Sequence, residues 1–212
     1  MSTKALTIGI AAVLVAMIAI ITLTAGGDHG DSANARKIDG AFIAEMTPHH
    51  ESAIEMAKVA LRRAEHPEIR KLAQAIVGAQ AEEIAALATI HSRLFGVPVS
   101  QGEHGTLGLP EHQLGMSGDM TMLDTAKPFD RAFIDMMVPH HQGAIRMARI
   151  ELRGGKDNEL MGIAQAIVAA QSREIEEMNS WRQDWYGSPS PTGGVPAEEE
   201  GAMPDQMMME HG

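Results

Sequence analysis

Residues 42–62 read FIAEMTPHHESAIEMAKVALR, and residues 133–153 read FIDMMVPHHQGAIRMARIELR. The two stretches align without a gap, and the same offset carries LAQAIVGAQAEEI at 72–84 onto IAQAIVAAQSREI at 163–175. Apolar residues in all four stretches recur at the three- and four-residue spacing of a helix with one buried face. The chain is therefore predicted to contain two copies of one helical hairpin.

Turn signals separate the two helices of each copy. His66-Pro67 places a proline at a first helical position, and Gly154-Gly155 before Asp157 supplies a helix end followed by an N-cap. Because short turns join antiparallel neighbours, we predict an all-α fold, a four-helix bundle in which a pseudo-twofold axis relates the two hairpins.

The repeat also divides the chain into domains. Repeat one spans 38–96 and repeat two spans 129–187, so that the bundle domain covers 38–187. Residues 97–128 are rich in Gly and Pro and are predicted to form a long crossover loop. Residues 188–212 lack periodicity, end in Met and His, and are predicted to be a disordered tail. The Met and His residues of the crossover are His104, His112, Met116, Met120 and Met122.

An uncharged apolar run, ALTIGIAAVLVAMIAIITLTA at 5–25, follows Lys4. As a helix it would span roughly 30 Å, the thickness of a bilayer core. A basic residue before such a run is typical of exported proteins. Residues 1–27 are therefore predicted to be a signal anchor or a signal peptide. The protein would be membrane-anchored and facing outside, or periplasmic or secreted after cleavage.

Composition excludes several classes of partner and site. The 212 residues carry a net charge of −11, which opposes binding to the phosphates of nucleic acids. The absence of Cys excludes disulfides and thiolate metal sites. With 16 Met in the chain, any soft-metal chemistry must use thioethers.

Each copy carries the motif Met-x-x-His-His-x-x-Ala-Ile-x-Met. At 100° per residue, its four Met and His side chains can all point inward from one helix. Thioether sulfur and imidazole nitrogen together suit Cu(I), whereas hard cations prefer oxygen ligands. We predict a copper site, Cu(I) being favoured, with another transition metal as the alternative. Its predicted ligands are Met46, His49, His50, Met56, Met137, His140, His141 and Met147.

Two other interpretations of the motif stay open. The His pairs could be buried hydrogen-bonding groups in a non-catalytic structural or interaction module. A ferritin-like metal-dependent oxidase is disfavoured, because the chain lacks the Glu-x-x-His motif of such enzymes. Hydrolase motifs are absent as well, so we expect no catalytic residue and no enzymatic activity.

Polar residues near the motifs allow further expectations. Acidic side chains on bundle helices usually face solvent, and this is predicted for Glu45, Glu51, Asp135, Glu82 and Glu83. Gln80 and Gln171 interrupt the apolar stripe of each second helix, where they would either support a histidine or make ordinary hydrogen bonds.

The stretches FIAEMTPHHESAIEMA and FDRAFIDMMVPHHQGAIRMA closely resemble the family named domain of unknown function 305, over roughly residues 38–187. This resemblance implies a ferritin-like four-helix bundle exported from bacteria. It also implies copper binding, which in some members is linked to copper resistance. The family's His-His and Met pattern falls on the eight residues named above. The implied function is copper binding or buffering for copper homeostasis or resistance.

Overall fold

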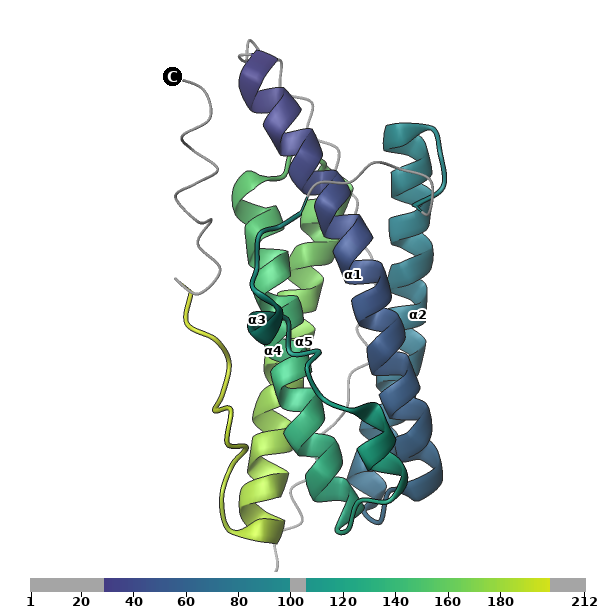
Figure 1. The fold of residues 1–212 in the computed structure, drawn as a ribbon, viewed down its shortest axis with the longest axis vertical. Helices are drawn as coiled ribbons and strands as arrows, with labels where there is room; N and C mark the ends of the chain where they lie inside the picture. Colours follow the sequence, from purple (N-terminus) through teal and green to yellow (C-terminus); the bar gives the residue numbers. More distant parts are fainter. Residues whose placement is uncertain (1–28, 100–105, 199–212) are drawn as a thin grey trace, which may run out of the picture.

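The computed structural model describes residues 29–99 and 106–198, and every regular element in these two ranges is helical (Figure 1). The predicted all-α class is thereby confirmed. In chain order the elements are α1 His29–Arg63, α2 Pro67–Phe95, α3 Glu111–Leu114, the 3-10 helix η2 Met120–Asp124, α4 Phe129–Gly154 and α5 Asn158–Tyr186.

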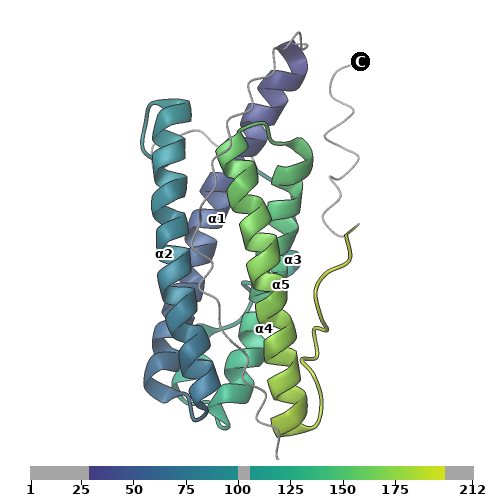
Figure 2. The same ribbon diagram turned by 180° about the vertical axis from the view of Figure 1, so that it is seen from behind.

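The four long helices form a bundle of two antiparallel hairpins (Figures 1 and 2). Helix α1 packs on α2, α4 packs on α5, and the two hairpins meet mainly where α1 contacts α4. Helices α1 and α4 run in opposite directions, and their two motifs meet where the helices cross, because the rings of His49 and His140 are 3.8 Å apart. The predicted helical bundle is confirmed, and its central interface joins the two helices that carry the His pairs.

Local sequence sets the helix ends. Helix α2 begins at Pro67 after His66, as predicted, and ends at Gly96, whose φ of 75° is left-handed and suits glycine. Helix α5 follows Asp157, whose carboxylate accepts hydrogen bonds from two backbone N–H groups of the first turn. The turn signals read from the sequence therefore lie where the chain reverses.

A proline lies inside each motif helix without ending it. Pro48 is within α1 and Pro139 is within α4, each directly before a His pair. Proline has no N–H, so the carbonyl four residues earlier loses its partner in the helix. Both helices nevertheless continue, and the His pairs stay on the inward face.

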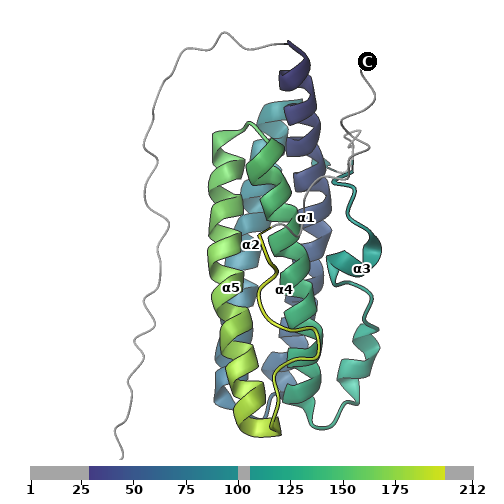
Figure 3. The ribbon, with the colours of Figure 1, turned by 90° about the vertical axis from the view of Figure 1, so that its left-hand side faces the viewer.

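Two boundaries differ from the predicted ones. Helix α1 begins at His29, before the predicted domain start at residue 38. The prediction of a disordered tail is wrong for residues 188–198, which lie along α4 and α5 (Figure 3). The reason is that buried side chains need acceptors: Arg182 donates to the carbonyls of Ser188 and Pro189, and Gln142 donates to two carbonyls farther along.

Several predicted segments lie outside the described residues. These are the N-terminal anchor or signal over 1–27, residues 100–105 of the crossover and residues 199–212 of the tail. Among the helices that the structure describes, none is both long enough and apolar enough to cross a membrane.

Two buried aspartates at equivalent positions of the repeats hold the hairpins together. Asp130 of α4 accepts hydrogen bonds from the backbone N–H groups of Glu65 (3.0 Å) and His66 (2.7 Å) in the turn between α1 and α2. Asp39 of α1 accepts one from the N–H of Lys156 (2.9 Å) in the turn between α4 and α5. Each repeat thus caps the turn of the other, which favours this pairing of the hairpins.

Glu151 lies buried near Asp39 at the second of these turns. Burial, assisted by the charge of Asp39, raises the pKa of Glu151 from 4.5 to about 9. The folded chain therefore keeps this proton at neutral pH, whereas the unfolded chain releases it. The contribution of this proton to the free energy of unfolding has its full value below pH 4.5 and is lost as the pH rises toward 9.

Replacing Glu151 by Gln should remove this pH dependence. Relative to the wild type, the free energy of unfolding of Glu151→Gln is expected to gain about 3 kcal/mol between pH 4.5 and pH 7. Urea unfolding of both proteins from pH 4.5 to pH 9 measures this difference in the free energy of unfolding. The contributions of other titrating groups are the same in both proteins and cancel in the difference. A difference that stays constant with pH would contradict the raised pKa of Glu151.

Candidate metal centre

The eight predicted ligands all lie on α1 and α4 and are buried. None has more than 3% of its surface exposed, so the prediction that they point into the bundle is confirmed. Their role as metal ligands stays a prediction. The residues are Met46, His49, His50 and Met56 on α1, and Met137, His140, His141 and Met147 on α4.

The two His pairs meet where α1 crosses α4. The ring centroids of His49 and His140 are 3.8 Å apart, with the rings inclined by 38°. Within each pair the centroids lie 6.5 Å apart, for His49 and His50 as for His140 and His141. The fold therefore gathers four imidazoles from two distant segments into one water-excluded region.

A carboxylate holds the outer histidine of each pair. His50 Nε2 lies 2.7 Å from Glu83 of α2, and His141 Nε2 lies 2.6 Å from Glu174 of α5. An ionised carboxylate only accepts, so in the neutral ring the proton lies on Nε2 and Nδ1 keeps its lone pair. Neither Nδ1 has a hydrogen-bond partner. Carboxylates commonly orient metal-binding histidines in this way.

The inner histidines are less satisfied. His49 Nε2 donates to the carbonyl oxygen of Leu114, at 2.9 Å, which leaves its Nδ1 without a partner. Neither ring nitrogen of His140 makes a hydrogen bond of normal geometry, although a weak contact with the His49 backbone opposes the fall in the pKa of the His140 ring. Unpartnered polar atoms in a protein interior cost free energy, and a bound metal ion is one way to satisfy them.

Burial also fixes the charge of these rings. Desolvation lowers the pKa of His49 to about 3 and lowers the pKa of His140 well below its ordinary value, and the neighbouring imidazoles add to both shifts. Both rings are therefore neutral at physiological pH. Neutral imidazole is the form that binds a metal ion.

The thioethers lie on either side of the His cluster. Met46 and Met147 belong to one buried cluster, and Met56 and Met137 belong to another. Because α1 and α4 are antiparallel, the first Met of each motif lies in the same cluster as the last Met of the other. A single repeated motif thereby supplies thioethers on both sides of the imidazoles.

Sulfur is needed for a complete ligand set. In the ranges 29–99 and 106–198, no three side chains of the types His, Asp and Glu lie so that they could hold a metal ion. A soft ion could combine the free imidazole nitrogens with the neighbouring thioethers, whereas a hard cation would lack a complete set of oxygen ligands. The residues present therefore fit a soft metal.

The acidic and amide residues differ in part from expectation. Glu51 and Glu82 are exposed, as predicted. The prediction of solvated faces is wrong for three others: Glu83 binds His50, Glu45 accepts the N–H of Leu107, and Asp135 pairs with Arg182. Gln80 and Gln171 are buried, and the Oε1 atom of each lacks a partner.

Sequence reasoning missed three groups beside the histidines: Glu83, Glu174 and the Leu114 carbonyl. A signal for the first two was present, because both occupy the same position of the repeat, in AEEI and SREI. No pattern in the sequence indicates the Leu114 contact, which depends on where the crossover segment lies in space.

A family model described as "Domain of unknown function (DUF305)" matches residues 39–181, and matches again at 130–212. The chain belongs to the DUF305 family. The second match starts within repeat two, as expected for a duplicated chain. Among curated proteins, Uncharacterized protein L153 of Acanthamoeba polyphaga mimivirus is 37% identical over 51 residues, which are 24% of this DUF305 protein and 34% of that relative.

Solved structures resemble this DUF305 protein over most of its length. CopM in the Cu(I)-bound form is 40% identical, with a TM-score of 0.61, and the match covers 70% of this chain and 98% of that one. Its Cu(II)-bound form is 41% identical at 0.62, covering 70% and 97%. A presumed secreted DUF305 protein from Streptomyces coelicolor is 25% identical at 0.64, covering 74% and 96%.

Proposed function

We propose that this DUF305 protein binds Cu(I) at the buried Met/His centre and buffers copper outside the cytoplasm. The observation that carries the proposal is the set of buried imidazole nitrogens that no group of the protein satisfies. Buried imidazole nitrogens without a hydrogen-bond partner cost free energy, and a bound ion would offset that cost.

The ligand chemistry supports copper in its reduced state. Thioether and neutral imidazole are ligands that Cu(I) accepts, and the Met and His side chains of the centre are buried from water. The similar protein CopM has been solved in Cu(I)-bound, Cu(II)-bound and Ag-bound forms. Ag(I) shares the softness of Cu(I), so both ions are suitable probes of this centre.

Each group in the centre has a distinct task. Because no three of the four histidines can reach one ion, at most two of their unpartnered nitrogens would bind a given ion, together with thioethers. Glu83 and its counterpart on α5 would hold the outer rings in the tautomer that exposes Nδ1. The flanking methionines would complete the coordination. None of these roles requires a catalytic step, and we propose a non-enzymatic function.

The proposed location rests on the apolar run at 5–25 and on the relative described as a presumed secreted protein. Copper outside the cytoplasm must be held without thiolates in a chain that has no Cys. A Met/His centre meets that requirement, because thioethers do not form disulfides in an oxidising compartment.

A structural or interaction module is the second candidate. The hydrogen bonds from His50 to Glu83 and from His141 to Glu174 favour it, because they show that part of the imidazole set has structural partners. This hypothesis does not explain why the two ring nitrogens of His140 are buried without a hydrogen-bond partner.

Titration of the purified full chain with Cu(I), in competition with a chromophoric chelator, tests the proposal. Binding that outcompetes the chelator is expected, together with binding of Ag(I) and none of Mg²⁺. X-ray absorption at the copper edge should show both nitrogen and sulfur neighbours. A chain that folds but takes no Cu(I) from the chelator would support the interaction module instead.

A further inference from the structure

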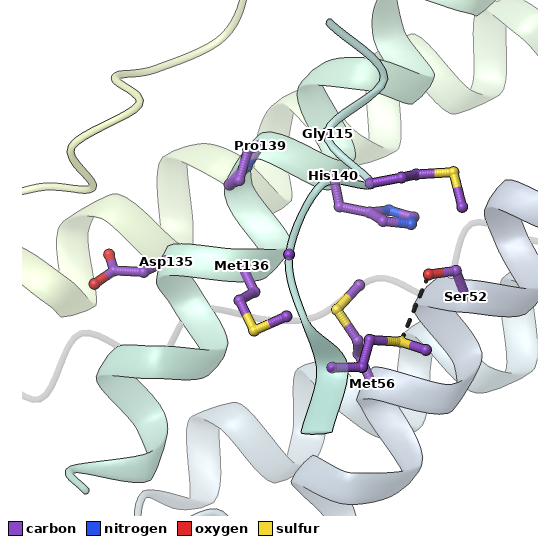
Figure 4. Close-up of a pocket in the computed structure, with 10 residues that line it drawn as sticks. Ser52, Met56, Gly115, Asp135, Met136, Pro139 and His140 are labelled. Carbon is purple, nitrogen blue, oxygen red and sulfur yellow. Dashed lines mark hydrogen bonds between the residues drawn. The ribbon is translucent and has the colours of Figure 1, made fainter. Parts of the chain in front are cut away.

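An open pocket of about 270 Å³ borders the buried centre, between α1, α4 and the crossover segment (Figure 4). Its walls come from three separate parts of the chain. Ser52 and Met56 belong to α1, Met136 and His140 belong to α4, and residues 115–120 form the outer rim. The pocket therefore joins solvent to the edge of the His cluster.

Four methionines line this pocket. Met56 is buried, Met136 is half-buried, and Met116 and Met120 of the crossover are 41% and 42% exposed. Apolar side chains that gather on one exposed surface often mark a binding site. In the described ranges, the large apolar side chains most exposed to water are all methionines of this one segment. Their common feature is the thioether sulfur.

Tight backbone packing fixes the rim of the pocket. Gly115 has a φ of +71°, and a Cβ there would lie 2.0 Å from the Pro139 carbonyl oxygen. A Cβ on Gly143 would lie 2.0 Å from the Leu114 carbonyl oxygen. Only glycine permits this contact between the crossover and α4. Met116 is thereby held beside the stretch of α4 that carries His140.

The polar groups of the pocket leave thioethers and one imidazole as ligands. Asp135 also lines the pocket, but its carboxylate is bound by Arg182, at 2.6 and 3.1 Å. Ser52 donates to the sulfur of Met120, at 3.8 Å. His140, 1% exposed, lines the inner wall with both ring nitrogens unpartnered. This donor set suits a soft monovalent ion.

The repeat does not by itself supply the methionines of this pocket. The position equivalent to Met136 in repeat one is Glu45, whose carboxylate accepts the N–H of Leu107. The duplication therefore explains the His pairs but does not explain the methionines of the pocket. The methionines of the pocket come together because the crossover segment lies on the α1 and α4 side of the bundle (Figure 3).

We propose that Met56, Met116, Met120 and Met136 form a solvent-open thioether site for Cu(I), from which the ion passes to His140. The site itself stands on the geometry of the pocket, and the transfer step rests on the proposed function of the buried centre. Successive exchange of thioether for imidazole ligands would let the ion move inward without ever being released to water.

Methionine methyl NMR of the full chain, titrated with Ag(I), tests the site directly. The ε-methyl signals of Met116, Met120 and Met136 are expected to shift with Ag(I), while that of Met122, which is exposed but outside the pocket, should not. Histidine ring signals report the buried centre separately. Ring shifts without pocket methyl shifts would overturn the site and leave the proposed function intact. Pocket methyl shifts without ring shifts would support the site and contradict the proposed function of the buried centre.

Kinetics test the transfer step. Loading of the buried centre from a Cu(I)–chelator complex should slow at least tenfold in Met116→Leu/Met120→Leu, while its equilibrium affinity stays within about twofold. Met122→Leu is the matched control and should load at the wild-type rate. A double variant that loads as fast as the wild type would overturn the transfer route.

Discussion

Replacing His140 by Leu is expected to stabilise the metal-free protein while it weakens Cu(I) binding at least a hundredfold. His140 is 1% exposed, and neither ring nitrogen has a hydrogen-bond partner. Leucine of similar volume removes two unsatisfied polar atoms and keeps the packing, a gain of about 1–3 kcal/mol in the free energy of unfolding. The lost imidazole removes a ligand from the centre of the His cluster.

The opposite signs of these two effects make the experiment decisive. A histidine kept for structure should behave like His66, which is hydrogen-bonded to Asp130 at 2.6 Å and stacked on Trp185 with centroids 3.7 Å apart. His66→Leu is the control and should lower stability without changing Cu(I) affinity. Urea unfolding of the metal-free variants and chelator competition supply the two readouts. Loss of stability in His140→Leu would support a structural role for the His pairs.

The architecture explains how a short motif can build a complete centre. One hairpin carries a His pair and two methionines, which are spread over a helix face and face no partner. The antiparallel contact of α1 and α4 brings His49 onto His140 and places Met46 in the same cluster as Met147. Asp39 and Asp130 cap the turns of the opposite repeats and so favour this register.

Much of this arrangement was readable from the sequence because it is local or repeated. Helical periodicity predicts the inward face of the motif, and His66-Pro67 predicts a turn. The repeat gives the Met and His residues of the motif on α1 counterparts in α4. These predictions require only the residues close to each position in the sequence and the alignment of the two repeats.

Contacts between distant segments could not be read in this way. Glu83 has the pattern of a solvated residue on α2, and only the packing of α1 on α2 brings it to His50. Residues 188–198 have the composition of a disordered tail, yet buried side chains such as Arg182 bind their carbonyls. The path of the crossover, which brings the Leu114 carbonyl to His49, is likewise invisible to periodicity.

Removing the carboxylates behind the outer histidines should reduce Cu(I) affinity without touching a ligand. In Glu83→Gln/Glu174→Gln, an uncharged amide replaces each carboxylate and can either donate or accept. The rings of His50 and His141 are then no longer confined to the tautomer that leaves Nδ1 free. Loss of such an outer partner typically costs about 10- to 100-fold in metal affinity, so the double variant should lose about 10²- to 10⁴-fold.

The matched control is Glu82→Gln/Glu176→Gln, which makes the same changes at exposed positions of α2 and α5. It removes the same charge from the protein, so any long-range electrostatic effect on a cation appears equally in both variants. Chelator competition with Cu(I) measures the affinities, and circular dichroism checks the fold. Equal affinity of the two double variants would mean that charge alone, and not the orientation of the imidazoles, sets Cu(I) binding.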